Sequence, residues 1–241
     1  MKTRLCLRGL RPRAAWAQPR SERLLEKGWR FTRGDAPEFA RNDCDDSDWQ
    51  PVTVPHDWAI YGPFSVGNDL QLTAIAQDGQ TQAMEHAGRT GGLPFVGTGW
   101  YRLRFEVPEL RKGGRCTLLF DGAMSHARVY VNGHEAIYWP NGYNAFHVDI
   151  TPFVRPDGEN LLAVRLENMP ESSRWYPGAG LLRNVHLLTT GDASVPVWGT
   201  RITTPVISES HARVGQQTEV MLPEGRPLPD YTLTTAPRHA V

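Results

Sequence analysis

The stretch Trp100-Tyr101-Arg102-Leu103-Arg104-Phe105-Glu106-Val107 alternates large apolar side chains with charged ones. Successive side chains of a β-strand point to opposite faces, so the apolar set faces one way and the charged set the other. Pro108 then ends the run, because proline cannot donate to a strand ladder. The stretch predicts a strand of an antiparallel sheet with one face in the core and the other in water.

Turn residues beyond this strand divide the chain into further short alternating runs. Asn132-Gly133 tolerates the positive φ angles of a two-residue type I′ turn, which predicts a hairpin between residues 128–131 and 134–138. The other predicted strands are residues 115–120, 146–150, 161–167 and 184–189. No long amphipathic helix interrupts them, so the series predicts an all-β sandwich.

Composition excludes several classes of function. Lys plus Arg and Asp plus Glu both count 26 in 241 residues, so no net charge favours a polyanion and nucleic acid is a poor partner. No apolar run approaches the roughly 18 residues that a membrane-spanning helix needs. Cys6, Cys44 and Cys116 lie far apart without metal-ligand spacing, so we expect neither a disulfide framework nor a zinc site.

The N-terminal residues 1–27 have the charge of an export signal without its apolar centre. The first twenty residues are basic and contain no acid, and Ala15-Trp16-Ala17 looks like a signal-peptidase site. We therefore expect either a damaged export signal or an unstructured tail. An intact parent protein would be periplasmic or secreted, whereas a leader that does not work would leave the chain in the cytoplasm.

Two further segments bear on domain organisation. Residues 62–99 are polar and rich in glycine, which predicts a long loop that meets a ligand or another domain, in preference to a disordered one. Residues 195–206 predict one strand of a second unit, and alternation is lost in the proline-rich tail from Leu222. The predicted organisation is a leader at 1–27, a sandwich at 28–190 and the incomplete start of a second sandwich at 191–241.

Three clusters could carry chemistry but favour structural roles. The aspartates from Asp43 to Asp48 lack the glycine and closing glutamate of a calcium loop, so a solvated turn is the preferred interpretation. His56-Asp57 has no serine nucleophile motif beside it and is expected to hold the turn between Val54 and Trp58. Trp139 and Tyr143 could stack on a sugar, although core or rim packing is the commoner role of such a pair.

Motifs along the chain resemble the N-terminal domain of glycoside hydrolase family 2, specifically its β-galactosidases. The resemblance begins at Pro55-His56-Asp57-Trp58 with Tyr61-Gly62-Pro63-Phe64 and extends over roughly Gly28 to Val214. Later matches are Gly99 to Arg102, Val131 to Gly133, Asp149 to Thr151, Gly158 to Asn160, Ser173 to Gly180 and Arg183 to Val185. The resemblance implies a jelly-roll, galactose-binding-like sandwich followed by an immunoglobulin-like sandwich.

The resemblance also limits the chemistry. Retaining glycosidases use two carboxylates about 5 Å apart, and in this family both lie on a (β/α)₈ barrel of about 250 residues after the second sandwich. No part of this sequence alternates strand with helix in that way. We expect the chain alone to be inactive, with no catalytic residue, no metal and no cofactor of its own.

In this family, loops of the first domain help to shape the sugar pocket, and the matching stretches are residues 92–98 and 172–178. Where the best-known members present an Asn and an Asp, this sequence has Val96 and Ser173. The candidate sugar contacts are then Arg174, Trp175 and Tyr176 beside Val96, because aromatic faces pack on sugar C–H groups and arginine donates to hydroxyls. The alternative is that Trp175 and Tyr176 only pin a turn against the core.

Three functions remain open at this stage. The first is the N-terminal part of a β-galactosidase-like enzyme that docks on the missing catalytic barrel and completes its pocket for a β-galactoside-like carbohydrate. The second is a stand-alone carbohydrate-binding module, and the third is a non-functional product of a frameshift. The sequence defines neither the sugar specificity nor the oligomeric state.

Overall fold

The computed structural model describes residues 20–65, 67–68, 70–86, 95–107, 110, 112–170 and 178–222. Two compact units divide the chain: a larger one formed by Ser21–Leu110 and Cys116–Thr189, and a smaller one that includes residues 190–222. No α-helix occurs within these described ranges, and no helix there is long and apolar enough to cross a membrane.

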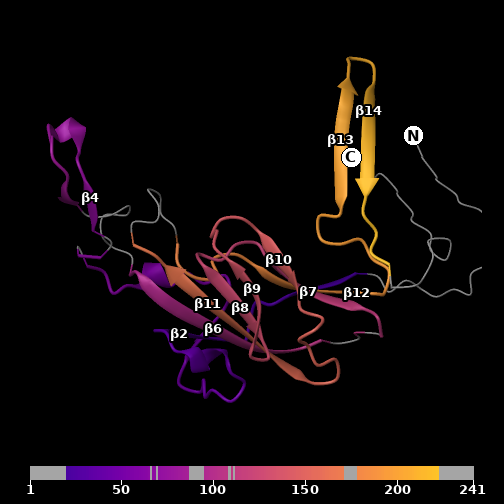
Figure 1. The fold of residues 1–241 in the computed structure, drawn as a ribbon, viewed down its shortest axis with the longest axis horizontal. Coiled ribbons are helices and arrows are strands. Elements are labelled where there is room, and N and C mark those ends of the chain that lie inside the picture. The colour runs from indigo at the N-terminus through magenta and orange to yellow at the C-terminus, as the bar shows by residue number, and fades with distance from the viewer. Residues whose placement is uncertain are drawn as a thin grey trace, which may run out of the picture. The chain divides into compact units, whose positions relative to one another are not determined.

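The larger unit contains a six-stranded antiparallel sheet with the strand order β3-β2-β6-β11-β8-β9. Figure 1 shows β2, β6, β11, β8 and β9 as neighbouring strands. The strands are β3 (Gln50–Val52), β2 (Trp29–Arg33), β6 (Gly97–Glu106), β11 (Glu159–Asn168), β8 (Ala127–Val131) and β9 (His134–Trp139). The predicted hairpin turn joins β8 to β9, with φ of 52° at Asn132 and 85° at Gly133, which confirms the positive-φ turn.

A second sheet has the strand order β1-β12-β7-β10. Its strands are β1 (Ser21–Leu24), β12 (Val185–Thr190), β7 (Arg115–Phe120) and β10 (Phe146–Asp149). The core cluster takes side chains from both sheets, among them Tyr101 and Leu162 from the first and Leu118 and Leu187 from the second. Two sheets that share one apolar core form a β-sandwich, so the predicted all-β class is confirmed.

The outer face of β6 differs from the prediction. Tyr101, Leu103 and Phe105 are buried in the core as expected, but Arg102 on the opposite face is also completely buried. The segment from η1 (Pro37–Ala40) to Trp49 covers that face and forms a second apolar cluster with Trp100. The first half of β6 is therefore buried on both sides, which alternation alone cannot reveal.

The expected long loop at residues 62–99 contains regular structure. A short antiparallel hairpin pairs β4 (Gln71–Thr73) with β5 (Met84–His86), and η3 (Ala76–Asp78) lies between them. The first sheet strand after it begins at Gly97 instead of Trp100. The prediction of a structureless connection was therefore wrong for the described part of this segment.

The smaller unit contains a two-stranded antiparallel ribbon of β13 (Thr200–Ile207) and β14 (Ala212–Thr218) (Figure 1). A register shift between Thr203 and Val206 inserts a bulge, and it reverses the side-chain alternation of β13. Ile202 and Ile207 therefore share one face with Val214. All three side chains are exposed.

Candidate functional site

One end of the sandwich gathers the ends of three strands and is called the loop end here. It comprises Arg33, residues 56–64, residues 95–97, Asn168 and residues 178–180. Register pairs Arg33 with Gly99 and Gly97 with Asn168, so β2 ends, β6 begins and β11 ends side by side. The topology thereby joins segments that are far apart in the sequence.

Val96 lies at the loop end and is half-buried, directly before β6. Its neighbour Phe95 accepts a hydrogen bond through its carbonyl from the side-chain amide of Asn168, at 2.7 Å. The other candidate contacts, Arg174, Trp175 and Tyr176, lie outside the described residues, as does Ser173. Their role stays a prediction, but Asn168 and Gly178 on either side of them both lie at the loop end.

Asp57 connects two segments of the loop end. Its Oδ1 accepts hydrogen bonds from the backbone N–H of Ala59 at 3.0 Å and of Ala179 at 2.9 Å. The backbone continues this pairing, because Trp58 donates to the carbonyl of Ala179 and His56 donates to that of Leu181, both at 2.8 Å. The expected structural role of His56-Asp57 in holding this turn is confirmed, and it extends to a segment 122 residues further along the chain.

His56 is buried and neutral in character. Its Nδ1 shares a hydrogen bond with the hydroxyl of Tyr101 at 2.7 Å. Burial lowers the pKa of His56 and raises the pKa of Tyr101 well above its ordinary value, because both charged forms would lose hydration. The pair links the 56–59 turn to β6, because Tyr101 lies on that strand.

Arg33 is the cation of the loop end. Its guanidinium lies over the ring of Phe95 at 4.8 Å from the ring centre. Nη2 donates to the carbonyl of Trp58 at 3.2 Å and also to the carbonyl of Gly62. Burial lowers the pKa of Arg33, although a guanidinium stays protonated in any aqueous protein environment.

Exposed apolar side chains border these anchors. Ile60 and Tyr61 lie on η2 (Trp58–Tyr61), and Phe64 follows two residues after Gly62. Tyr61 is 68% exposed and Phe64 57% exposed, although Tyr61 also stacks on His56. Exposed aromatic faces held by rigid backbone suit a surface that receives a sugar or another domain.

Trp139 and Tyr143 take different roles. Trp139 packs against the core and stacks on Phe146, with ring centres 5.4 Å apart. Tyr143 is exposed, and its backbone N–H is held by the side chain of Asn141. Core packing is therefore the role of Trp139, as the sequence favoured.

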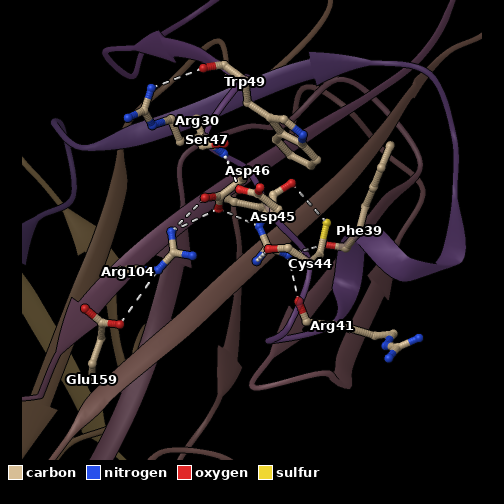
Figure 2. A network of polar contacts seen from close by, with 11 residues as sticks. Arg30, Phe39, Arg41, Cys44, Asp45, Asp46, Ser47, Trp49, Arg104 and Glu159 are labelled. Atoms are coloured by element: carbon tan, nitrogen blue, oxygen red, sulfur yellow. Dashed lines mark hydrogen bonds and ion pairs between the residues drawn. The ribbon is translucent and has the colours of Figure 1, made fainter.

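Asp46 of the aspartate cluster belongs to an ion-pair network that sequence reasoning missed (Figure 2). Asp46 is 6% exposed and contacts Arg102 at 2.7 Å and Arg104 at 3.0 Å. Figure 2 shows Arg104 between Asp46 and Glu159. The solvated-turn interpretation was wrong for Asp46 because the arginines on the outer face of β6 need a buried anion.

The same network satisfies the donors of Arg102 with protein atoms. Arg102 also donates to the carbonyls of Phe39, Arg41 and Cys44, so its fork of donors is satisfied by protein atoms. Within the described part of the chain, no group of three His, Cys, Asp or Glu side chains could hold a metal ion. Arg102 was the one sequence signal for this network, because a charged residue beside the apolar residues of β6 requires a partner. The spacing of the sequence does not indicate that this partner is Asp46.

Comparison with known proteins defines the class. Residues 23–191 match the sequence model of the sugar binding domain of glycosyl hydrolases family 2. The match covers more than half of the chain, and the chain belongs to this family.

Individual proteins that are similar to this chain support the family assignment. The β-galactosidase BoGH2A of Bacteroides ovatus is 37% identical over 195 residues, which are 80% of this chain and 21% of that protein. A putative β-glucuronidase of Formosa agariphila is 29% identical over 202 residues, 83% of this chain and 18% of that protein. A crystal structure of a family 2 glycosyl hydrolase from Bacteroides cellulosilyticus has a TM-score of 0.67 and 36% identity, covering 83% of this chain and 24% of that one. The chain spans about a fifth of the length of the curated relatives that it matches.

Proposed function

We propose that this chain serves as the N-terminal sugar-binding part of a β-galactosidase-like enzyme that hydrolyses O-glycosidic bonds. In this proposal a (β/α)₈ barrel outside the 241 residues supplies the two catalytic carboxylates. The chain contributes one side of the pocket, and it is inactive without the barrel. The loop end is the surface that faces the barrel and its β-galactoside-like substrate.

The observation that carries the proposal is the double anchoring by Asp57. One carboxylate oxygen holds both the 56–59 turn and the segment that follows residues 171–177. Such anchoring supports a preorganised surface, which lowers the entropic cost of binding. Val96, Arg174, Trp175 and Tyr176 remain the proposed sugar contacts, to which Tyr61 and Phe64 add exposed aromatic faces.

The proposed organisation keeps a leader at residues 1–27, a sugar-binding sandwich at 28–190 and the start of a second sandwich at 191–241. The ribbon of β13 and β14 supports the last assignment, because Ile202, Ile207 and Val214 expose one apolar face. Two strands alone rarely bury enough surface to be stable. A further sheet of the parent enzyme would cover this face.

Complementation tests the proposal. The full chain is mixed with the Bacteroides ovatus β-galactosidase from which the matching segment has been deleted, and hydrolysis of a chromogenic β-galactoside is measured. We expect activity only when both pieces are present. Asp57→Ala should reduce the restored activity at least tenfold, because it releases two backbone segments of the pocket wall.

Asp45→Ala is the matched control. Asp45 also accepts a backbone hydrogen bond, from Ser47 at 2.9 Å, but it lies in the aspartate cluster and outside the loop end. Its loss should leave complementation unchanged. Tight binding of free galactoside by the chain alone would instead favour a stand-alone binding module. A soluble, folded chain that neither complements nor binds sugar would refute the proposal, and an aggregated chain would favour the frameshift product.

A further inference from the structure

Two Asn-Gly pairs occur in the chain, Asn132-Gly133 and Asn141-Gly142. Glycine has no side chain to shield its nitrogen, so that nitrogen can attack the side-chain amide of a preceding asparagine. The attack releases ammonia and converts the asparagine to an acid. The structure holds the two asparagine side chains differently, and this difference determines which of them is open to the reaction.

The side chain of Asn132 is bound to neighbouring segments through both of its polar atoms. Its Nδ2 donates to the carbonyl of Phe153 and to Oδ1 of Asn160, both at 2.8 Å. Its Oδ1 accepts from the backbone N–H of Leu161 at 3.0 Å. Loss of ammonia from Asn132 breaks the two hydrogen bonds of Nδ2 and leaves a carboxylate against two oxygen acceptors. The fold therefore opposes the reaction at this position.

The side chain of Asn141 is bound only through its oxygen. Oδ1 accepts the backbone N–H groups of Tyr143 and Asn144, both at 2.9 Å. In the part of the chain that the structure describes, Nδ2 of Asn141 makes no hydrogen bond, and neither does the N–H of Gly142. Asn141 is also exposed to solvent. No hydrogen bond among these residues therefore has to break before Gly142 attacks or before ammonia leaves.

The two N–H groups on Oδ1 of Asn141 also favour the reaction itself. Attack on Cγ moves negative charge onto Oδ1, and hydrogen-bond donors about 2.7–3.1 Å away stabilise such an oxyanion. After hydrolysis the same donors face a carboxylate, and hydrogen bonds to a charged acceptor are stronger than those to a neutral amide. The turn thus supports both the intermediate and the product.

Packing keeps glycine at position 142. An added Cβ would collide with the side chain of Met124 and lie 3.0 Å from its Cα. Met124 in turn exchanges two backbone hydrogen bonds with Gly180 of the loop end, both at 3.0 Å. The reactive pair is therefore a consequence of this packing, and it lies next to a residue that holds the loop end.

We propose that Asn141 is a site of spontaneous deamidation in the folded chain and that Asn132 is protected. The Gly142 nitrogen gives up its proton to hydroxide and bonds to Cγ of Asn141, while Nδ2 takes up a proton and leaves as ammonia. Water then opens the cyclic imide at either carbonyl, which produces aspartate or isoaspartate at position 141. The net reaction consumes water and releases ammonia. The inference is independent of the proposed function, because the reaction uses only this chain and water.

The test incubates the full chain in mildly alkaline buffer, at a temperature below its unfolding transition. Samples are digested in weakly acidic buffer with a protease that cleaves after glutamate, because Glu135 separates Asn132 from Asn141. Mass spectrometry follows the gain of about 1 Da in each peptide, and fragmentation locates the changed residue. We expect the reaction at Asn141 to be about tenfold faster, or more, than the reaction at Asn132.

Three controls accompany this measurement. In denaturant both Asn-Gly pairs are released from the fold, so they should react at similar rates. Asn144 precedes Ala145 on the same peptide as Asn141, and it should show no comparable gain. Asn141→Ser keeps an oxygen acceptor for the turn but has no amide to lose. It should abolish the fast gain and leave the rate at Asn132 unchanged, and its thermal unfolding checks that the fold is intact.

Equal rates at Asn132 and Asn141 in the folded wild-type chain would overturn the inference. So would a folded chain in which Asn141 stays intact over a period in which the denatured chain reacts completely, because the turn would then protect the amide. A fast gain that persists in folded Asn141→Ser would assign the reaction to another residue and would also overturn it. The comparison of Asn132 with Asn141 in the wild-type chain decides the question even if the variant does not fold.

Discussion

The exposed strand β13 and the buried strand β6 differ in what lies against them. Every residue of β13 is exposed, whereas β6 is buried in the core on one face and under residues 37–49 on the other for half of its length. Both strands carry enough β-branched or aromatic residues to form strands. Strand formation and strand burial therefore have different causes. A strand can form from its own residue types, whereas its burial depends on segments that are distant in the sequence.

The largest effect should come from breaking the cover of β6 at its charged centre. Asp46→Ala leaves Arg102 completely buried without its counter-ion. We expect a loss of about 3 to 5 kcal/mol in the free energy of unfolding of the sandwich. Denaturant unfolding followed by tryptophan fluorescence measures it.

Asp43→Ala is the control for this prediction. Asp43 pairs with Arg41 at 2.6 Å, but both side chains are more than 60% exposed, at 68% and 65%. Its loss should be hard to detect, because exposed ion pairs contribute little. Similar losses for the two variants would mean that Asp46 is not the anchor of the outer face.

A smaller loss should follow from filling the close approach at Gly180. This residue has φ of 127°, and an added Cβ would collide with the hydroxyl of Tyr101 and lie 2.5 Å from the carbonyl oxygen of His56. Gly180→Ala should destabilise the sandwich by about 2 to 4 kcal/mol through overpacking and backbone strain. Gly34→Ala isolates the backbone part, because Gly34 has φ of 113° and no atom within 4 Å of an added Cβ. Equal thermal shifts for the two variants would contradict close packing at Gly180.

The buried His56 should make the sandwich sensitive to mild acid. Burial lowers the pKa of His56 below its ordinary 6.5, so the unfolded chain binds a proton at a pH where the folded chain does not. Stability from this residue is therefore complete above about pH 6.5 and falls as the pH drops below it. His56→Gln should flatten the profile of unfolding free energy between about pH 7 and pH 5. An unchanged slope would assign the titration to another group.

A second, separate acid transition is expected from the paired carboxylates. The hydrogen bonds from Arg165 lower the pKa of Asp35, so its contribution is present above its ordinary value of 3.8 and is lost below it. This lower transition should persist in His56→Gln. The two windows therefore distinguish the histidine from the ion pairs in a single pH titration.

The smallest effect should come from the exposed ribbon. Ile202→Thr removes an apolar group that is 65% exposed, and we expect the unfolding free energy of the sandwich to change by less than about 0.5 kcal/mol. Val164→Thr in β11 places a hydroxyl at a fully buried position and should cost about 1 to 3 kcal/mol. Comparable losses for the two variants would show that β13 is packed against a partner surface.

Sequence reasoning correctly predicted the elements that are indicated by patterns of neighbouring residues. The alternation of residues 100–107 predicted β6 to within a few residues, and Asn132-Gly133 predicted the β8–β9 hairpin. The series of motifs that begins at Pro55-His56-Asp57-Trp58 indicated the family, and His56-Asp57 predicted a structural turn. Sequence reasoning could not identify the hairpin of β4 and β5, because three-residue strands show too little alternation to be distinguished from a loop.

By itself, the sequence determined the class of fold, because the period of apolar residues and the turn chemistry are properties of neighbouring residues. The tertiary structure alone decided that Arg102 is buried beside Asp46, that Val96 lies next to Asn168, and that Asp57 holds Ala179. Each of these pairs joins residues more than 50 positions apart, and register and strand order, which no local pattern encodes, bring them together.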